Sequence, residues 1–556
     1  MTTTDLASIL DTITGRATFG DQIRRHARNQ PDRLALAYYG KSGERLDQVT
    51  YAELNARANQ TARSLRERGV RHGDVVSIMS ANSLDYATLY VAAAKLGAVT
   101  TGINRNFHDA EILYQIQHAE PSVILTESLL TGRIDAIRDQ LPSIRLYLAS
   151  ASDGDAGSAL DSAWTPLAEL YADSVDASEI ESDVRERDPL FTTYTSGTEA
   201  FPKAVLIPHR NYAVATVPGW ALGAPGPTDE MSGGIVAHHD RWLHLTPLHT
   251  IAGIGNLSIT LSAGATVIMP SVTEPDLSLA LIEAERVTVT VQTPTFFLAA
   301  VRSPRFAEAD LSSVERVLTY GATMPQAMID GWNAKSARLK WGTYWGQSEL
   351  TQLGTTGWFR TLDDIPGRDV SWIGKPVGTL ELILVKEDGE LAGVDEVGEA
   401  WCRSPGVMLG YYKDPERTAQ TFEGGWLHTG DVMRRDANGH LFFLDRRKDI
   451  IKSGGYNVSS QEVEKLLYAH PEVSQVAVVG LPHEYWSEAV TAFVVQRPEA
   501  SVSAEDLIAF CKERAVNYKV PKSVVFLSAL PVDGQGKVLK RELRRLNVNH
   551  YDGQAS

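Results

Sequence analysis

The sequence has few cysteines and no excess of positive charge. Two cysteines occur in 556 residues, Cys402 and Cys511, and there is no CxxC pair. Neither a disulfide framework nor a zinc site is supported, and we expect two buried thiols. Acidic side chains outnumber basic ones by 69 to 53, which gives a formal net charge of −16. This charge argues against nucleic acid or an anionic membrane as the main partner, although a locally basic pocket is compatible with it.

The sequence also lacks a segment typical of targeting or of membrane insertion. The first 16 residues carry two Asp and no basic cluster, unlike a signal peptide. The uncharged run 242–273 is interrupted by Pro247, Pro270 and three glycines, which favours buried strands and helices over a membrane span. We therefore expect a cytoplasmic protein without an integral membrane segment.

The length and the local pattern predict more than one α/β domain. Single hydrophobic cores stop growing near ~250–300 residues, and this chain has 556. A capping box at Thr50 and Glu53 opens a helix that ends at Gly69. Alternating elements follow: strand 75–79, helix 86–96, which stops at Gly97, and strand 122–126, then strands 265–269, 287–291 and 314–318. This alternation indicates an open parallel sheet with crossover helices.

The pattern changes toward the C-terminus. From about residue 380 the strands become shorter and are separated by DG and NG turns, which predicts a small β-rich subdomain. After residues 445–449 we expect a compact α+β part. Its helix begins with a second capping box, Ser459 to Glu462, and a strand at 475–479 follows.

Residues 191–209, FTTYTSGTEAFPKAVLIPH, combine hydroxyl groups, one glycine and one lysine. Backbone N–H groups, hydroxyls and an ammonium in one small volume suit a polyphosphate. The stretch is not the P-loop of nucleotide hydrolases, because GxxxxGK[ST] is absent and Lys203 lies six residues after Gly197. The alternative is a polar turn between two strands.

Five further motifs occur in a fixed order: YGA at 320–322, YWGQSE at 344–349, WLHTGD at 426–431, LDRRKDIIKSGGY at 444–456 and LPVDGQGK at 530–537. Together with TSGTEAFPK they resemble the adenylate-forming enzymes, which comprise acyl- and aryl-CoA synthetases, peptide-synthetase adenylation domains and beetle luciferases. The similarity is greatest to the acyl-CoA synthetases. It extends from about residue 19 to residue 544.

The resemblance implies an α/β fold with two domains. The large N-terminal domain, residues 1–445, would contain two sheet-and-helix subdomains and a β-barrel-like one. A small mobile α+β domain, residues 446–556, would follow. The implied reaction has two halves, in which ATP and a small-molecule carboxylic acid first give an acyl-adenylate and pyrophosphate, and the adenylate then acylates a thiol.

The resemblance also assigns the phosphate and metal sites. Two anions must approach each other in the first half-reaction, so positive charge and donors have to be fixed there beforehand. Ser348, where the family usually has threonine, would donate to the α-phosphate, and Glu349 would bind Mg²⁺ through a hard carboxylate oxygen. The loop that grips the β- and γ-phosphates would comprise Thr195, Ser196, Gly197, Thr198 and Lys203.

The implied nucleoside site uses backbone, aromatic and charged groups. Asp431 would accept both ribose hydroxyls and Arg446 would contact ribose or phosphate, although an Asp in an HTGD turn is otherwise a turn former. The adenine would lie against Gly321, Ala322, Trp345, Gly346 and Phe443. Trp345 replaces the usual tyrosine and could instead be a core tryptophan.

Lysines and glycines near the C-terminus complete the implied site. Lys537 would reach both the attacking carboxylate and the α-phosphate. Lys448 would be the hinge of a domain rotation that moves Lys537 out of the active site and brings in the face containing Lys452. Lys452 would be a second catalytic residue. Gly454 and Gly455 would line a narrow pantetheine tunnel. Alternatively, Lys537 is a solvated lysine without a catalytic role, and the basic run RRKDIIK at 446–452 is a solvated linker.

The phosphate loop departs from the family pattern TSGTTGxPKG. Glu199-Ala200 follow Thr198, and Ala204 follows Lys203. We expect a stiffer loop, in which the Glu199 side chain points away from the phosphates or meets a cation. Asp533 also stands where threonine is common.

The acid is expected to have no α-amine. Amino-acid-activating relatives need an aspartate near His249, but residues 246–255 contain no acid, and an unpaired ammonium in an apolar pocket is costly. Small residues such as Gly253 and Gly255 are expected to leave room for a bulky acid. The acid pocket is expected to include His249, Trp220 and Gly253. Trp220, Ile251, Ile254, Phe296 and Phe297 would line the pocket or belong to the core. Fatty, aryl and polycyclic acids all stay open.

Coenzyme A is the expected acceptor, because the glycine pair is kept and no insertion follows the hinge. A carrier-protein thiol is the alternative within the same enzyme class, and luciferase-type oxidation is a further possibility that no feature favours. A non-catalytic nucleotide- or acyl-binding protein is the alternative from another class. The presence of Lys203, Glu349, Asp431 and Lys537 argues against it.

Overall fold

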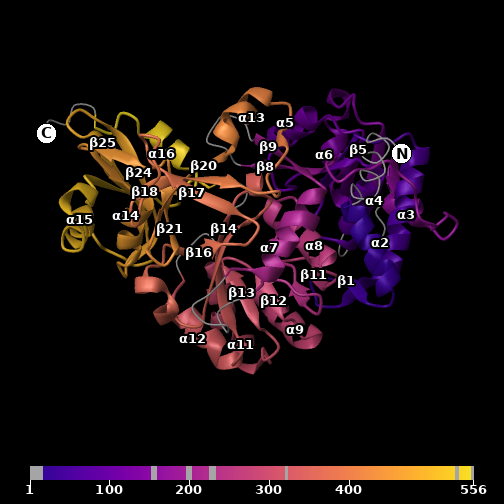
Figure 1. Cartoon of the computed structure of the whole chain (residues 1–556), viewed down its shortest axis with the longest axis horizontal. Helices are drawn as coiled ribbons and strands as arrows, with labels where there is room; N and C mark the ends of the chain where they lie inside the picture. The colour runs from indigo at the N-terminus through magenta and orange to yellow at the C-terminus, as the bar shows by residue number, and fades with distance from the viewer. Residues whose placement is uncertain are drawn as a thin grey trace, which may run out of the picture. The chain divides into compact units, whose positions relative to one another are not determined.

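The computed structural model describes residues 17–151, 160–195, 203–224, 233–319, 324–532 and 538–551. By its internal contacts the chain divides into two compact units. The N-terminal unit comprises Met1–Thr195, Phe201–Glu381 and Arg403–Leu427, and the C-terminal unit comprises Ser196–Ala200, Leu382–Cys402 and His428–Ser556. Figure 1 labels many of their helices and strands.

The first sheet of the N-terminal unit has the order β19-β9-β8-β4-β3-β5-β6-β7. Its strands from β8 to β7 in this order are parallel neighbours, whereas β8, β9 and β19 pair antiparallel. The strands are β3 (Val75–Met79), β4 (Val99–Gly102), β5 (Val123–Glu127), β6 (Leu146–Ser150), β7 (Trp164–Pro166), β8 (Pro189–Thr195), β9 (Lys203–Pro208) and β19 (Gly410–Tyr411).

Three helices alternate with these strands along the chain: α3 (Tyr51–Glu67) precedes β3, α4 (Leu84–Leu96) lies between β3 and β4, and α5 (Asp109–Ala119) lies between β4 and β5. Thr50 and Glu53 form the predicted capping box. Gly97 ends α4 in a left-handed conformation, with φ of 77°. These local predictions are confirmed because each rests on backbone chemistry within a few residues.

The second sheet of the N-terminal unit runs β2-β1-β11-β10-β12-β13-β14-β15-β16. It is parallel from β1 to β14 and antiparallel at both ends. The strands are β1 (Leu34–Tyr39), β2 (Arg45–Thr50), β10 (Arg241–Leu243), β11 (Thr266–Pro270), β12 (Val289–Val291), β13 (Arg316–Thr319), β14 (Lys340–Gly346), β15 (Gly354–Phe359) and β16 (Trp372–Pro376). Between β10 and β11 lies α8 (Ile251–Ser262), so the run 242–273 consists of buried strands and a helix, as predicted.

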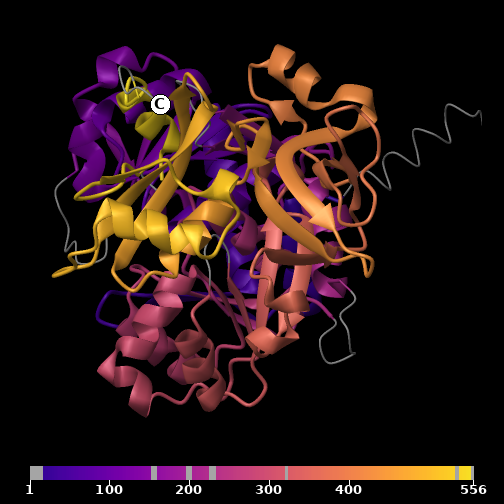
Figure 2. The same ribbon diagram turned by 90° about the vertical axis from the view of Figure 1, so that its left-hand side faces the viewer.

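The C-terminal unit contains two groups of strands, drawn in orange to yellow in Figure 2. The first has the order β17-β18-β20-β21 and the second the order β23-β22-β25-β24, with β26 beside β25. Their bounds are β17 (Glu381–Val385), β18 (Val397–Arg403), β20 (Leu427–Arg435), β21 (Leu441–Arg446), β22 (Ile451–Ser453), β23 (Tyr456–Val458), β24 (Val473–His483), β25 (Ser487–Gln496) and β26 (Ser523–Phe526). Three helices accompany them, α14 (Ser460–Tyr468), α15 (Ala504–Lys512) and α16 (Lys540–Leu546).

The predicted capping box at Ser459 is half formed. Ser459 Oγ accepts the N–H of Glu462 at 3.2 Å, but the Glu462 carboxylate pairs with Lys519. Lys519, which is distant in the sequence, therefore takes the place of the Ser459 backbone N–H as the partner of the Glu462 carboxylate.

The predicted α/β class, with a large N-terminal and a small C-terminal part, is confirmed. The boundary after residue 445 and the mobility of the C-terminal part stay predictions. None of the helices in the described ranges combines the length and the apolar composition that crossing a membrane requires.

Candidate active site

The described residues of the predicted phosphate loop lie at the end of a β-hairpin. Thr195 ends β8 and pairs directly with Lys203, the first residue of β9. The hydroxyl of Thr195 donates to the Lys203 carbonyl at 3.4 Å. Ser196, Gly197, Thr198, Glu199 and Ala200 lie outside the described residues. The hairpin thus brings the two ends of the motif together, and a polar turn between strands would share this geometry.

Lys203 and Glu349 meet around one phenol ring that the sequence analysis did not identify. The Tyr411 hydroxyl donates to Glu349 Oε1 at 2.9 Å, and Lys203 Nζ lies 5.1 Å from the centre of the Tyr411 ring. Tyr411 is 8% exposed. Burial, and next the charge of Glu349, raises the pKa of Tyr411, so the phenol stays a hydrogen-bond donor. The local sequence GYY at 410–412 does not indicate this role, because the contact depends on the long-range pairing of β19 with β9.

Glu349 lies in a short 3₁₀ turn, Ser348–Leu350, after β14. Its carbonyl accepts the N–H of Met408 at 2.9 Å. Among the described residues, hydrogen bonds reach its carboxylate at Oε1, and Oε2 receives none. A hard carboxylate oxygen of this kind fits Mg²⁺, and no cluster of three or more His, Cys, Asp or Glu that could hold a metal occurs in the described part of the chain.

Trp345 and Gly346 are the last two residues of β14, and Ser348 begins the 3₁₀ turn that follows. Trp345 pairs with Thr355 and Gly346 with Gly354 on β15. Trp345 and Ser348 are each 8% exposed. Because these residues lie within four positions of Glu349, the predicted adenine and α-phosphate contacts are local to the predicted metal ligand. Gly321 and Ala322 lie outside the described residues.

The predicted acid-pocket residues differ in their surroundings. Trp220 is 1% exposed and stacks on Trp242, with ring centres 6.3 Å apart. Phe297 is fully buried against Trp332 and Trp341, as expected for a core residue. Burial, and secondarily the charge of Arg105, lowers the pKa of His249 to about 4. The His249 imidazole is therefore neutral near pH 7.

The glycines of α8 do not leave free space, and that expectation was wrong. A Cβ on Gly253 would lie 1.9 Å from the Pro247 carbonyl oxygen, and a Cβ on Gly255 would lie 1.6 Å from Gln352 Oε1. The glycines instead allow close packing of α8 against a turn and a side chain.

Gln352 is a further residue that the sequence analysis missed. It is 5% exposed, and both polar atoms of its amide lack a hydrogen-bond partner among the described residues. A buried amide without partners is costly. Nothing in the local sequence signals this burial.

In the C-terminal unit, Asp431 and Arg446 lie opposite each other on β20 and β21. Arg446 Nε is 2.6 Å from Asp431 Oδ1, and the Asp431 side chain is 1% exposed while that of Arg446 is 41% exposed. Phe443 lies on the same strand, opposite Met433. The residues predicted to bind the ribose thus form a buried carboxylate held by a half-exposed guanidinium.

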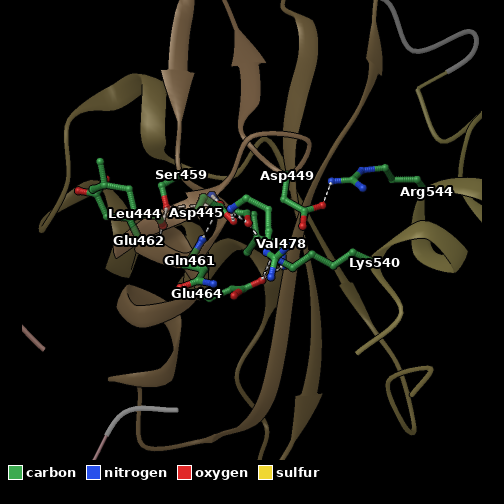
Figure 3. Close-up of polar contacts among 12 residues, drawn as sticks. Leu444, Asp445, Asp449, Ser459, Gln461, Glu462, Glu464, Val478, Lys540 and Arg544 are labelled. Carbon is green, nitrogen blue, oxygen red and sulfur yellow. Dashed lines mark hydrogen bonds and ion pairs between the residues drawn. The ribbon is translucent and has the colours of Figure 1, made fainter. Parts of the chain in front are cut away.

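The segment around the predicted hinge is tied to α14. Asp445 Oδ2 accepts the N–H and the hydroxyl of Ser460, each at 2.6 Å, and the N–H of Gln461 at 3.3 Å (Figure 3). A carboxylate at this position satisfies the free N–H groups of the helix and interacts well with its dipole. Lys448, the predicted hinge residue, is exposed.

Helix α16 contacts both α14 and the segment around the predicted hinge. Lys540 Nζ lies 2.8 Å from Glu464 Oε1 and donates to Ser460 Oγ at 2.5 Å, and Arg544 pairs with Asp449 at 2.8 Å (Figure 3). Lys537 lies outside the described residues, just before this helix.

Lys452 and the glycine pair form an exposed hairpin. Lys452 pairs with Glu387 at 2.6 Å. Gly454 and Gly455 have φ of 57° and 83° and make the two-residue turn between β22 and β23. This left-handed turn alone requires glycine, so the predicted pantetheine contact stays a prediction.

Comparison with known proteins gives matches over most of the chain. The AMP-binding enzyme family matches residues 23–412, and the AMP-binding enzyme C-terminal domain matches residues 462–537. Indoleacetate–CoA ligase of Aromatoleum aromaticum is 30% identical over 525 residues, which cover 94% of this chain and 97% of that enzyme. Long-chain-fatty-acid–CoA ligase FadD13 of Mycobacterium tuberculosis is 31% identical over 499 residues, covering 89% and 92%. ATP-bound MatB from Rhodopseudomonas palustris superimposes with a TM-score of 0.80 at 26% identity, covering 96% of this chain and 100% of that one.

Proposed function

The chain belongs to the AMP-binding enzyme family and is an AMP-forming acid–CoA ligase, and we propose that its acid is largely apolar, without an α-amine, and carries one hydrogen-bonding group. In the first half-reaction a carboxylate oxygen attacks the α-phosphorus of ATP and pyrophosphate leaves. In the second, the thiol of coenzyme A displaces AMP from the acyl carbon. A carrier-protein thiol is the alternative acceptor.

The observation that most supports this chemistry in the described residues is the meeting of Lys203 and Glu349 around Tyr411. Two anions react only where charge and donors are already in place. Lys203 would hold the β- and γ-phosphates, and Glu349 would hold Mg²⁺. When bound, that cation neutralises phosphate charge.

We assign the remaining predicted residues to the same steps. Ser348 would donate to the α-phosphate, and Asp431 with Arg446 would bind the ribose. Trp345, Gly346 and Phe443 would contact the adenine, and Thr195 would begin the phosphate loop. Lys537 would act in adenylation, Lys448 as the hinge, and Lys452 with Gly454 and Gly455 in thioester formation.

The proposed character of the acid rests on Gln352 and α8. The Gln352 amide is buried beside Gly255 and has no hydrogen-bond partner among the described residues, and the same helix carries the apolar side chains of Ile251, Ile254 and Leu257. An acid with an N–H, hydroxyl or carbonyl group on an apolar body would satisfy this amide. A plain long-chain fatty acid is the second candidate, and it would leave the amide unsatisfied.

A panel of acids tests this assignment. Purified protein is incubated with ATP, Mg²⁺ and each acid, with and without coenzyme A, and pyrophosphate and acyl-CoA are measured. Indole- and hydroxyaryl-alkanoic acids should release pyrophosphate and form thioesters faster than saturated fatty acids of similar volume. Preference for fatty acids would contradict the role of Gln352, and absence of acid-dependent pyrophosphate across the panel would contradict the ligase function.

A further inference from the structure

Residues 408–412 connect the two predicted phosphate-site motifs at fixed distances. The Tyr412 N–H donates to the Ala204 carbonyl at 2.8 Å, and the Leu409 N–H donates to the Leu206 carbonyl at 2.9 Å. This pairing attaches the segment to β9, which begins at Lys203. At its other end, the Met408 N–H holds the carbonyl of Glu349. One short segment therefore sets the separation between Lys203 and Glu349.

The Tyr411 side chain adds an orientation to that distance. Its own N–H donates to Thr418 Oγ1 at 2.9 Å, so the backbone of Tyr411 is fixed on both sides. Its hydroxyl then fixes Oε1 of Glu349, which stops rotation of the carboxylate and leaves Oε2 without a donor from the described residues. Carboxylates that bind metals are usually held by such hydrogen bonds.

We propose that Tyr411 is a positioning residue for the Mg²⁺ complex of ATP: its phenol holds the Glu349 carboxylate so that Oε2 faces the cation, and its ring keeps Lys203 beside it. This inference rests on the proposed function of Glu349 and Lys203. Tyr411 itself touches neither the metal nor the nucleotide. It acts through the two side chains that do.

The test separates Mg²⁺ binding from turnover. ATP binding is measured by calorimetry without acid, in EDTA and over a series of Mg²⁺ concentrations, for wild type, Tyr411→Phe and the neighbouring control Tyr412→Phe. Tyr411→Phe keeps the ring near Lys203 and removes only the hydroxyl. Its half-saturating Mg²⁺ concentration should rise about 10-fold, while ATP affinity in EDTA stays within about twofold and Tyr412→Phe behaves as wild type.

Glu349→Asp provides a second variant should Tyr411→Phe fail to fold in a thermal-unfolding control. It keeps the charge but is one methylene shorter, so it cannot reach the phenol, and it should show a similar rise in the Mg²⁺ requirement. A Mg²⁺ requirement equal to that of wild type in folded Tyr411→Phe overturns the proposal, whereas an unchanged requirement in Glu349→Asp contradicts the ligand role of Glu349 on which the proposal rests. Wild type that binds ATP without any Mg²⁺ dependence contradicts the underlying function instead.

Discussion

The phenol of Tyr411 lies between two side chains that separate sequence motifs identify, Lys203 and Glu349. Each motif is visible in the sequence because its residues are close together along the chain. The role of Tyr411 is not visible in the sequence, since its position depends on the pairing of β19 with β9. Gln352 was missed for the same reason, because its burial against Gly255 comes from packing between distant elements.

Another residue-scale feature is a buried imidazole that must stay neutral. His209 is fully buried, and its Nδ1 accepts the N–H of Phe19 at 3.2 Å. Burial lowers the pKa of His209 from 6.5 to about 4. Because the unfolded chain takes up this proton more readily, stability is complete above pH 6.5 and falls as the pH decreases toward 4.

We predict that His209→Gln makes this pH dependence shallower. Gln keeps an acceptor for Phe19 but does not titrate. Urea unfolding between pH 6.5 and 4 should show a slope smaller by up to about 1.4 kcal/mol per pH unit than in wild type. Other buried histidines cancel in the comparison. Equal slopes would contradict the neutral state assigned to His209.

At the scale of elements, helix ends and turns followed from the sequence where the chemistry is local. The capping box of α3 and the left-handed Gly97 after α4 are examples. The start of α14 at Ser459 was also predictable, but the use of Asp445 to hold its N-terminal N–H groups was not. That contact joins β21 to a helix, and no local pattern encodes it.

The ion pair between α16 and α14 gives a stability prediction. The side chains of Lys540 and Glu464 are 17% and 15% exposed. Burial raises the pKa of Glu464, an effect that Lys540 opposes. Lys540→Met should lower the free energy of unfolding at pH 7 by about 3–5 kcal/mol, because it leaves a buried carboxylate without its cation.

Adding Glu464→Gln to Lys540→Met should recover part of the lost stability, since the remaining side chain is then neutral. Arg545→Met is the matched control, because its partner Glu542 lies on the same helix and the pair is exposed, so its loss should stay below about 0.5 kcal/mol. Chemical denaturation measures all three variants. Equal stability of the single and double variants would show that the pair carries no buried charge.

At the scale of the whole molecule, the α/β class and the positions of several strands could be predicted from alternating apolar segments. Strand 75–79, for instance, is β3. The order of strands could not, because neighbours such as β1 and β11 are far apart in the chain. The expected parallel pairing holds in the centre of both N-terminal sheets, whereas β2, β15, β16, β9 and β19 at their ends pair antiparallel.

The two half-reactions should depend on different lysines. Lys537→Ala should reduce acid-dependent pyrophosphate exchange by about 10²–10³-fold, since it removes charge stabilisation from the adenylation step. Thioester formation from supplied acyl-adenylate and coenzyme A should be nearly unchanged. Lys512→Ala, which changes an exposed lysine at the end of α15, is the control. Equal loss of both half-reactions would contradict the role of Lys537.

Isotope transfer tests the central chemical claim most directly. The preferred acid is labelled with ¹⁸O in its carboxylate and turned over with ATP and coenzyme A, and the AMP is analysed by mass spectrometry. If the carboxylate attacks the α-phosphorus, the AMP carries one ¹⁸O from the acid. AMP without label, or label found in pyrophosphate or inorganic phosphate, would contradict the acyl-adenylate.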